Sequence, residues 1–374
     1  MDRGREPGTQ AAEYMARALA LAERGLGLAP PNPLVGALLL KDGRVVGEGW
    51  HEGPGSPHAE MAAIAAAGDA ARGATLYTTL EPCGHHGRTP PCAPAIVEAG
   101  VAEVVVAAVD PNPVVDGRGL RYLRDAGLRV VDGVLQERAE HMNAGFAKHV
   151  RTGLPYVTLK LAASLDGKTA ARDGSSRWIT GEEARRDAHW LRARSGAIVV
   201  GAGTVLADDP SLTVRLDEYR GRQPVRVVID GRGRTPPTAA VLDGSAPTVI
   251  ATTPAAPVQV RRDWEAAGVE VILIENGDEA SLPLRRLIEL LGKRDVQDVL
   301  IEGGPTVAWA VVEAGLVDRL VLYLSPKLIG GTEAPGITGG SGIPNIAEAI
   351  PLTIRDVTRI GDDLKVVADV HRDR

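Results

Sequence analysis

The chain has 374 residues, of which 44% are hydrophobic and 24% charged, so it is long enough to fold as two or three globular domains. Its 42 Lys and Arg against 48 Asp and Glu give a net charge of −6, which disfavours a dedicated nucleic-acid-binding protein with a concentrated basic face. The stretch 1–25 is charged throughout and the apolar runs are short or interrupted, so we expect no secretory signal, no membrane span and a cytoplasmic location.

The N-terminal part alternates between predicted helices and strands. Apolar residues recur at helical spacing over Glu13–Arg24, and a Gly- and Pro-rich stretch then ends that helix. Two short strands surround a Lys-Asp-Gly turn, and an Ala-rich run predicts a helix that starts near Pro57–His58. A strand, ATLYTTL, leads into a loop, and Cys92–Ala99 begins the next helix. The order β-β-α-β-α-β-α-β predicts an α/β domain with helices packed on a central sheet.

The alternation restarts in the C-terminal part, which indicates a second α/β domain. We place the boundary near residues 145–153 and take 1–148 and 149–374 as the two domains. Helices are predicted over Glu182–Arg194, Leu282–Lys293 and Thr306–Glu313. Predicted strands are YVTLKLAAS, AIVVGAG, VRVVIDG, TVIATT, VEVILI, DVLIEGG and RLVLYLSPKLIG.

The cysteine loop carries the most specific chemical pattern of the chain. Both cysteines, Cys83 and Cys92, lie within EPCGHHGRTPPC, and His58 and Glu60 form an H-x-E motif at a predicted helix start. One His and two Cys leave the fourth tetrahedral position of a zinc ion open, as catalytic sites require. Such a zinc lowers the pKa of its bound water toward about 7, so that Glu60 can take that proton and deliver it to a leaving amine. The pattern is similar to the H-x-E and P-C-x-x-C signature of zinc deaminases, but here the second cysteine stands nine positions after the first.

Other interpretations of these residues remain open at this stage. The cysteines could form a disulfide, or a structural zinc site completed by His85 or His86, although the structural zinc site leaves Glu60 without a role and closes the position that hydrolysis needs. His51 and His58 could also be ordinary surface histidines. At the level of the whole chain, the rivals are a nucleic-acid deaminase, a zinc-stabilised binding protein, and an enzyme in which one half has lost its activity. The acidic, aromatic-poor composition disfavours the first rival.

With these motifs in view, the chain resembles the bifunctional deaminase/reductase family of riboflavin biosynthesis over essentially its full length. PNPLVGALL, HAE and EPCGHHGRTPPC resemble the deaminase motifs of that family, and LKLAASLDGKTA, GSSRWITGEEARRDAHW and IEGGPT resemble its reductase motifs. The resemblance implies a cytidine-deaminase-like α/β/α domain followed by a dihydrofolate-reductase-like α/β domain. It implies deamination of a phosphorylated, nucleotide-like pyrimidine followed by reduction of its ribosyl group to ribityl, with one Zn²⁺ per chain and NADPH as cofactors. No nucleic acid or membrane partner is expected, and a homo-oligomer is compatible with the family.

The resemblance also implies roles for individual residues of the first domain. His58, Cys83 and Cys92 would hold zinc, and Glu60 would be the catalytic acid and base. Four further positions would contact the deaminase substrate: Asn32, His51, His85 and Arg88. A lysine is common at the last position, and the arginine found here can still meet a phosphate.

For the second domain, the resemblance implies a cofactor site and a substrate site. The NADPH site would be lined by Ala162, Trp178, Thr204, Asp208, Gly304, Pro305, Thr306 and Val307. The sugar-phosphate substrate would be contacted by Lys168, Ser176, Arg192, Leu212, Arg215 and Glu302. Without the resemblance, IEGGPT could be a simple strand-to-helix turn and the arginines could be solvated charges. The proton donor of the reduction stays open between water and a nearby acid.

Two arginines bear on the choice between NADPH and NADH. Arg232 and Arg234 follow a predicted strand at a place where the 2′-phosphate of NADPH could sit. We therefore predict that these two arginines favour NADPH over NADH. No G-x-G-x-x-G fingerprint of the usual dinucleotide-binding fold is present.

Overall fold

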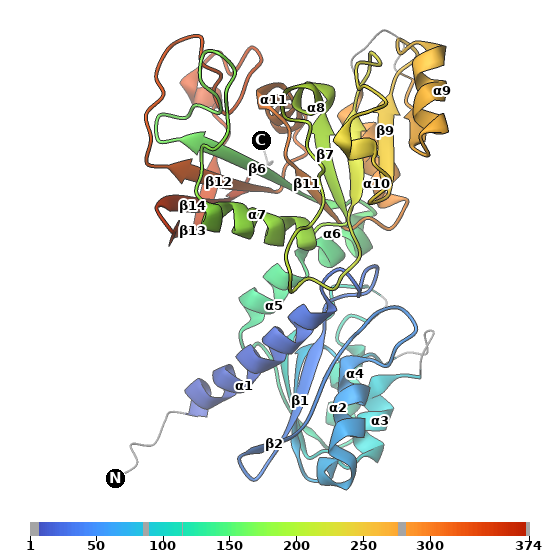
Figure 1. Cartoon of the computed structure of the whole chain (residues 1–374). Coiled ribbons are helices and arrows are strands. Elements are labelled where there is room, and N and C mark those ends of the chain that lie inside the picture. The colour runs from blue at the N-terminus through green and yellow to red at the C-terminus, as the bar shows by residue number, and fades with distance from the viewer. Residues whose placement is uncertain (1–6, 85–89, 114, 276–281, 372–374) are drawn as a thin grey trace. The chain divides into compact units, whose positions relative to one another are not determined.

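The structure is a computed structural model that describes residues 7–84, 90–113, 115–275 and 282–371. Contacts within the chain divide it into two compact units, Met1–Gly153 and Leu154–Arg374 (Figure 1). The expectation of two α/β domains is confirmed, because each unit has its own sheet covered by helices.

The first unit is built on a mixed sheet of five strands in the order β2-β1-β3-β4-β5. The β1 strand is antiparallel to both β2 and β3, whereas β3, β4 and β5 run parallel. The strands are β1 (Gly36–Lys41), β2 (Arg44–Trp50), β3 (Thr75–Leu80), β4 (Glu103–Ala108) and β5 (Arg129–Val131). The helices described are α1 (Pro7–Ala22), α2 (Ala59–Ala67), α3 (Cys92–Glu98), α4 (Arg118–Asp125), α5 (Gln136–Met142) and α6 (Ala144–Thr152), with short 3₁₀ turns η1 (Glu23–Gly25) and η2 (Gly68–Ala71).

Both faces of this sheet are buried, each by its own set of helices. Alternate residues of β1 face opposite sides: Leu39 packs with α2, α3 and α4, and Leu38 packs with α1 and α5. The α2 helix lies very close to β2, since a Cβ at Gly49 would come within 2.4 Å of the Ala59 carbonyl oxygen. Glycine in β2 therefore fixes where α2 begins, and with it the position of the His58 and Glu60 motif.

The second unit is built on a sheet of nine strands in the order β10-β9-β8-β7-β11-β6-β12-β14-β13. The seven strands from β10 to β12 are parallel, and β14 and β13 add an antiparallel hairpin at one edge. The strands are β6 (Tyr156–Ser164), β7 (Ala197–Gly201), β8 (Val225–Ile229), β9 (Thr248–Thr252), β10 (Glu270–Leu273), β11 (Asp298–Ile301), β12 (Arg319–Ser325), β13 (Leu352–Ile360) and β14 (Asp363–Val370). The helices described are α7 (Glu182–Ala193), α8 (Ala202–Asp208), α9 (Val258–Ala266), α10 (Leu284–Gly292) and α11 (Pro305–Glu313), with 3₁₀ turns η3 (Ala240–Leu242) and η4 (Ile346–Glu348).

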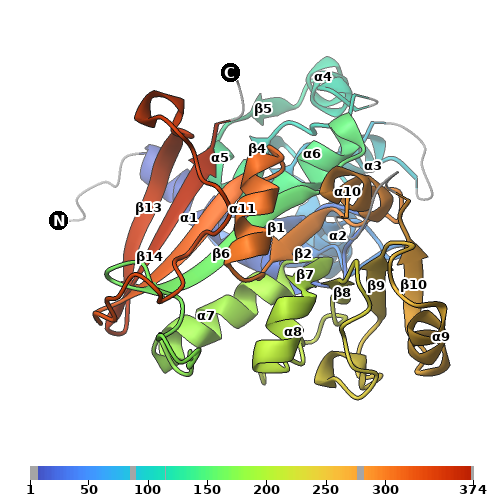
Figure 2. The ribbon, with the colours of Figure 1, turned by 90° about the horizontal axis from the view of Figure 1, so that it is seen from above.

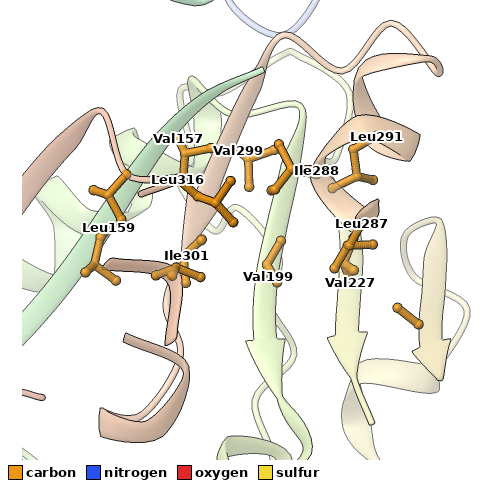
Figure 3. Packing of buried hydrophobic residues seen from close by; sticks show 14 of the residues in the cluster. Val157, Leu159, Val199, Val227, Leu287, Ile288, Leu291, Val299, Ile301 and Leu316 are labelled. Atoms are coloured by element: carbon orange, nitrogen blue, oxygen red, sulfur yellow. The ribbon is translucent and has the colours of Figure 1, made fainter. Parts of the chain in front are cut away.

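The main core of the second unit lies between the sheet and the helices α10 and α11 (Figure 3). Val157 and Leu159 of β6 and Leu287 and Leu291 of α10 belong to one buried cluster. The other face of the sheet is covered by α7, α8 and α9, as the view from above shows (Figure 2). Because side chains alternate along β6, Lys160 lies on the face toward α7, where the predicted substrate residues gather.

The structure also contains elements that the sequence did not predict. The helices α8 and α9 and the β13–β14 hairpin were not expected, and neither were α5 and α6 before the boundary. The β13 strand is largely exposed at the sheet edge, so it lacks the apolar alternation that marks a half-buried strand. The α9 helix is mostly polar and is held through its buried Trp264, whose ring N–H donates to the Thr235 carbonyl oxygen at 2.9 Å.

Candidate active sites

The three predicted zinc ligands come together in the first unit. His58 is the N-cap of α2, Cys83 follows β3, and Cys92 is the first residue of α3. His58 Nδ1 lies 3.2 Å from Cys92 Sγ and 3.6 Å from Cys83 Sγ, and the three ligand atoms lie within 4.8 Å of one another. Zn–S bonds of about 2.3 Å and Zn–N bonds of about 2.0–2.1 Å at tetrahedral angles require N–S separations of about 3.5 Å. The residues therefore fit a zinc ion with three protein ligands.

The two cysteines are not bonded to each other, so the disulfide interpretation is wrong. The hydrogen bond with Cys92, helped by His58, lowers the pKa of the Cys83 thiol to about 4, and the same contact raises the pKa of Cys92. One thiolate is thus already favoured, and a bound dication would favour both. Interpretations that use His85 or His86 as a fourth ligand fall on residues outside the described part of the chain.

Glu60 lies in the first turn of α2, buried at 3% exposure beside the three ligands. Burial is the main cause that raises the pKa of Glu60 to about 7, and the nearby His58 acts in the opposite direction. A carboxyl group in such an environment can both accept and return a proton near neutral pH. His58 precedes the helix as its N-cap, whereas Glu60 lies in the first turn. This difference in backbone conformation lets both side chains point toward the zinc site although they are only two positions apart.

The predicted substrate residues Asn32 and His51 lie next to the metal ligands. Asn32 Nδ2 is 2.8 Å from His51 Nε2, and His51 Nδ1 is 3.2 Å from the Pro57 carbonyl oxygen. The His51 ring stands edge-on to His58, with 5.6 Å between the ring centroids. Burial lowers the pKa of His51, so the ring stays neutral and accepts from Asn32 while it donates to Pro57. His51 is buried, which removes the interpretation of an ordinary surface histidine.

Sequence reasoning missed the role of Glu81, which precedes the Pro82-Cys83 pair. Its buried carboxylate accepts backbone N–H groups from Asp110, Gly117, Gly119 and Leu120 at 2.8–3.3 Å. Glu81 thus ties the Cys83 segment to the loop before α4 and to the first turn of that helix. In the sequence, only the position of Glu81 directly before Pro82-Cys83 indicated a role for it, since its hydrogen-bond partners are about thirty to forty positions away.

The second unit has a charged site between β6, α7 and β11. Arg192 donates to both carboxylate oxygens of Glu302, from Nε at 3.0 Å and from Nη2 at 2.6 Å. Burial opposes ionisation of Glu302, but Arg192 and Lys160 outweigh it and lower the Glu302 pKa to about 2. Two half-buried cations thus surround one buried carboxylate. Lys160 also lies over the Tyr323 ring at 5.8 Å, and burial lowers its pKa. Lys160 was not among the predicted site residues.

The remaining predicted reductase residues form smaller groups. Gly304 donates its N–H to Thr204 Oγ1 at 3.1 Å, and Ser176 Oγ donates to Asp208 Oδ1 at 3.3 Å. The backbone at Gly304 is open, because among the described residues other than its chain neighbours a Cβ there would meet only Thr204 Oγ1 within 4 Å, at 3.6 Å. An open glycine at the start of α11 fits the approach of a dinucleotide phosphate.

The other predicted positions differ in exposure and partners. Trp178 is 64% exposed, with the Arg185 guanidinium 4.4 Å from its ring centroid. Leu212 is buried with a left-handed backbone at φ 52°, and Ala162 lies on the α7 side of β6. Lys168 Nζ donates to the Ala334 carbonyl oxygen at 2.9 Å, so it is tied to a different segment from Arg192. His85 and Arg88 lie outside the described residues.

Comparison with protein families assigns each unit to a class. Residues 9–108 match the cytidine and deoxycytidylate deaminase zinc-binding region, and residues 155–366 match the RibD C-terminal domain. The chain is thus an enzyme with a zinc-binding deaminase domain followed by a reductase domain of dihydrofolate-reductase-like fold, whose family uses NADPH.

Relatives along the whole chain give the family itself. The riboflavin biosynthesis protein RibD of Escherichia coli is 46% identical over 362 residues, covering 94% of this chain and 97% of the relative. That of Bacillus amyloliquefaciens is also 46% identical, covering 96% and 99%. Among solved structures, Acinetobacter baumannii RibD matches with a TM-score of 0.84 at 40% identity, covering 97% of this chain and 99% of the other. A deaminase/reductase from Thermotoga maritima matches with a TM-score of 0.84 at 35% identity, covering 98% and 100%.

This chain belongs to the RibD family, the bifunctional deaminases and reductases of riboflavin biosynthesis. The resemblance in the sequence motifs is therefore confirmed, together with the two activities and the two cofactors. Within the described residues, none of the helices has the length and apolar character needed to cross a bilayer.

Proposed function

We propose that the chain deaminates 2,5-diamino-6-ribosylamino-4(3H)-pyrimidinone 5′-phosphate by hydrolysis and then reduces the ribosyl group with NADPH. The product is 5-amino-6-ribitylamino-uracil 5′-phosphate. The observation that carries the first step is the cluster of His58, Cys83 and Cys92 beside the buried carboxyl group of Glu60. The name of the Thermotoga maritima relative, a diaminohydroxyphosphoribosylaminopyrimidine deaminase and 5-amino-6-(5-phosphoribosylamino)uracil reductase, supports this choice of substrates.

We assign hydrolysis to residues 1–148 and reduction to residues 149–374. In the first domain, His58 Nδ1 and the sulfurs of Cys83 and Cys92 would hold the zinc, which supplies an acidified water when bound. Glu60 takes a proton on its carboxylate and returns it to the leaving amine. A buried carboxyl group is suited to this exchange because neither of its protonation states is strongly favoured near neutral pH.

The pyrimidine is oriented in this proposal by Asn32 and His51, with His85 and Arg88 contributing from the cysteine loop. The neutral His51 ring orients the Asn32 amide, so the outward amide atoms are set for hydrogen bonds to a ring substituent. Arg88 would meet the 5′-phosphate.

In the second domain, NADPH supplies the hydride when bound, and the chain holds the opened sugar against it. The cofactor lies in this proposal against Ala162, Trp178, Thr204, Asp208 and the run Gly304–Val307. The substrate contacts are Lys168, Ser176, Arg192, Leu212, Arg215 and Glu302. Lys160 stands beside Glu302 as a cation whose pKa is lowered by burial, so it is placed to give a proton to a sugar oxygen.

Arg232 and Arg234 are proposed to select NADPH over NADH. They follow β8, which is parallel to β7 and next to it in the sheet, so their loop lies at the same sheet edge as Gly201 at the end of β7. Ligands of open parallel sheets bind outside these carboxyl ends. Buried Asp230 accepts N–H groups from Gly233 and Thr235 at 3.0 Å and 2.6 Å and so shapes the loop. Reversing the charge of both arginines should lower the preference for NADPH, and an unchanged preference would refute this assignment.

The protein is further proposed to act in the cytoplasm, without a nucleic-acid partner, and to be able to form a homo-oligomer. The net charge of −6 supports the absence of a nucleic-acid partner. Sedimentation of the purified chain would test the oligomeric state.

The decisive test of the function uses the purified chain and the diaminopyrimidinone nucleotide, with and without NADPH. Without NADPH, we expect ammonia release and a product that keeps its ribosyl group. With NADPH, we expect the ribityl product and oxidation of one NADPH per ammonia released. Consumption of NADPH without ammonia release would contradict the proposed order of the two steps.

A further inference from the structure

The segment Leu212–Arg215 carries two of the proposed substrate contacts, yet it belongs to neither a helix nor a strand. Loops of this kind hold a defined shape only when their backbone groups have partners. Leu212 has a left-handed backbone at φ 52° and a side chain that is buried at 1% exposure, so the start of the segment is anchored in the core. The partners of the next residues decide where Arg215 lies.

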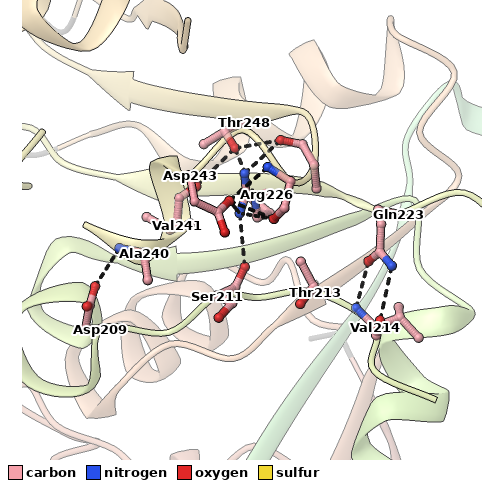
Figure 4. A network of polar contacts seen from close by, with 12 residues as sticks. Asp209, Ser211, Thr213, Val214, Gln223, Arg226, Ala240, Val241, Asp243 and Thr248 are labelled. Atoms are coloured by element: carbon pink, nitrogen blue, oxygen red, sulfur yellow. Dashed lines mark hydrogen bonds and ion pairs between the residues drawn. The ribbon is translucent and has the colours of Figure 1, made fainter. Parts of the chain in front are cut away.

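Each of these residues is held by a different side chain. The Thr213 carbonyl oxygen accepts from Arg192 Nη1 at 3.1 Å. Val214 makes two bonds with the Gln223 amide, which accepts the Val214 N–H at 2.7 Å and donates to the Val214 carbonyl oxygen at 3.1 Å (Figure 4). The Arg215 N–H donates to His189 Nδ1 at 3.2 Å.

Two of these partners lie on one face of α7. His189 and Arg192 are three positions apart in the helix, so their side chains are neighbours on its surface. His189 offers an acceptor and Arg192 a donor to the backbone of the segment Leu212–Arg215. We propose that His189 is a positioning residue for the reduction, which places Arg215 by accepting its backbone N–H. This inference rests on the proposed role of Arg215 in binding the substrate.

The role requires a neutral imidazole, because an imidazolium has no acceptor. Four charged groups from three elements and the segment itself surround the ring: Arg192 on α7, Arg215, Lys160 on β6, and Glu302 after β11. Burial first, and then Arg192 and Arg215, lower the pKa of His189 to about 4, while Glu302 acts in the opposite direction. The ring therefore stays neutral at physiological pH, with its proton on Nε2 and its lone pair on Nδ1 facing Arg215.

The test compares variants of the full chain for reduction of the deaminated nucleotide. His189→Ala removes the acceptor, and we expect the KM for this substrate to rise about five- to ten-fold, as the loss of one neutral hydrogen bond predicts. The kcat should change less than the KM, and the dissociation constant of NADPH should stay the same. His189→Asn places an amide oxygen near the position of Nδ1 and should restore most of the KM. The unchanged dissociation constant of NADPH reports that the second unit of each variant is folded, and deamination serves as the control for the first unit.

Two further measurements separate this inference from the proposed function. Arg215→Ala should raise the KM for the nucleotide more than His189→Ala does. Comparison of ¹⁵N spectra of the unsubstituted chain and of His189→Asn at pH 6 identifies the His189 signal, because only the variant lacks it. That signal should be that of a neutral ring protonated on Nε2. If His189→Ala leaves the KM unchanged while Arg215→Ala raises it, or if His189→Asn is as impaired as the alanine variant, the positioning role is wrong. If neither His189→Ala nor Arg215→Ala affects the KM, the proposed substrate role of Arg215 is wrong.

Discussion

At the scale of single residues, each site contains a buried carboxyl group, and the two groups ionise differently because their charged neighbours differ. Glu60 lies beside one imidazole and two cysteines, and burial raises its pKa to about 7. Glu302 is also buried, but Arg192 and Lys160 keep it ionised, with a pKa of about 2. The first environment suits proton transfer, and the second holds a fixed negative charge.

Glu60→Gln removes the proton carrier and leaves all three metal ligands in place. We expect zinc content to be unchanged and the kcat of deamination to fall by at least about 100-fold, the usual contribution of a general acid or base. Metal analysis and ammonia release measure the two quantities. Glu98→Gln, at an exposed position on α3, is the matched control and should keep full activity. Substantial turnover by Glu60→Gln would contradict its role.

Arg192→Leu leaves the Glu302 carboxylate buried without its main partner. We expect the second unit to lose about 3–5 kcal/mol of stability, since removing one member of a buried ion pair exposes the full desolvation cost of the other. The double variant Arg192→Leu with Glu302→Leu should regain most of that loss. Urea unfolding measures these changes. Arg286→Leu, which breaks an exposed pair with Glu289, should cost about 1 kcal/mol or less.

The same pair predicts an acid-sensitive reductase unit. The Glu302 pKa is lowered from 4.5 to about 2 on folding, so its stabilising effect is fully present above pH 4.5 and is lost as the pH falls toward 2. The shift corresponds to roughly 3 kcal/mol. Unfolding free energies measured between pH 6 and pH 3 should decrease, and the decrease should be smaller in the double leucine variant. Equal pH dependence in both proteins would contradict this assignment.

At the scale of elements, close packing between helices and strands places the reactive groups. The α11 helix begins two residues after Gly303, and a Cβ at Gly303 would come within 2.7 Å of Val307 Cβ. The Cβ of an alanine at Gly119 would come within 1.8 Å of the Pro82 carbonyl oxygen, next to Cys83. Because glycine has no side chain, Gly303 lets the first turn of α11 approach the end of β11, and Gly119 lets α4 approach the Cys83 segment.

Gly303→Ala should therefore destabilise the second unit by about 1–3 kcal/mol and weaken NADPH binding, because α11 must shift to admit the methyl group. Gly203→Ala is the matched control, since the residue lies in α8 and a Cβ there would meet no atom within 4 Å in the described part of the chain beyond its neighbours and its own helix backbone. It should be neutral or stabilising by up to about 1 kcal/mol. Thermal unfolding and NADPH titration measure both variants. Equal effects of the two substitutions would refute the packing argument.

At the scale of the whole molecule, the chain joins two units that each have their own sheet and core. The zinc ligands all belong to the first unit, and the Arg192–Glu302 site belongs to the second. Chemical damage to one site should therefore spare the other.

Removal of zinc by a chelator should abolish deamination and leave the reduction of added deaminated nucleotide within about two-fold of its original rate. The reason is that the three zinc ligands all belong to the first unit, so loss of the metal should affect the activity and folding of that unit alone. Ammonia release and NADPH oxidation, measured on the same sample, check this, and added Zn²⁺ should restore the first activity. A parallel loss of both activities would show that the units depend on each other.

The sequence by itself determined the family, the two α/β units and the zinc ligands. His58, Cys83 and Cys92 were predictable because metal-ligand chemistry allows few residue types and the spacing of the motif is distinctive. Most strands of the two sheets, but not β13 and β14, were also predictable, since buried parallel strands such as β7 are short, continuous apolar runs. The exposed β13 and the polar α9 carry no such signal, and only packing against the rest of the unit reveals them.

Only the tertiary structure decided which polar residues act together. Glu81 binds the loop before α4, Lys160 interacts electrostatically with Glu302 after the neighbouring strand β11, and His189 accepts the Arg215 backbone N–H. Nothing in the local sequence distinguishes Lys160 from a lysine on the surface of an edge strand. The ionisation state of each group depends on the burial and charges around it, and these arise from segments that are far apart in the chain.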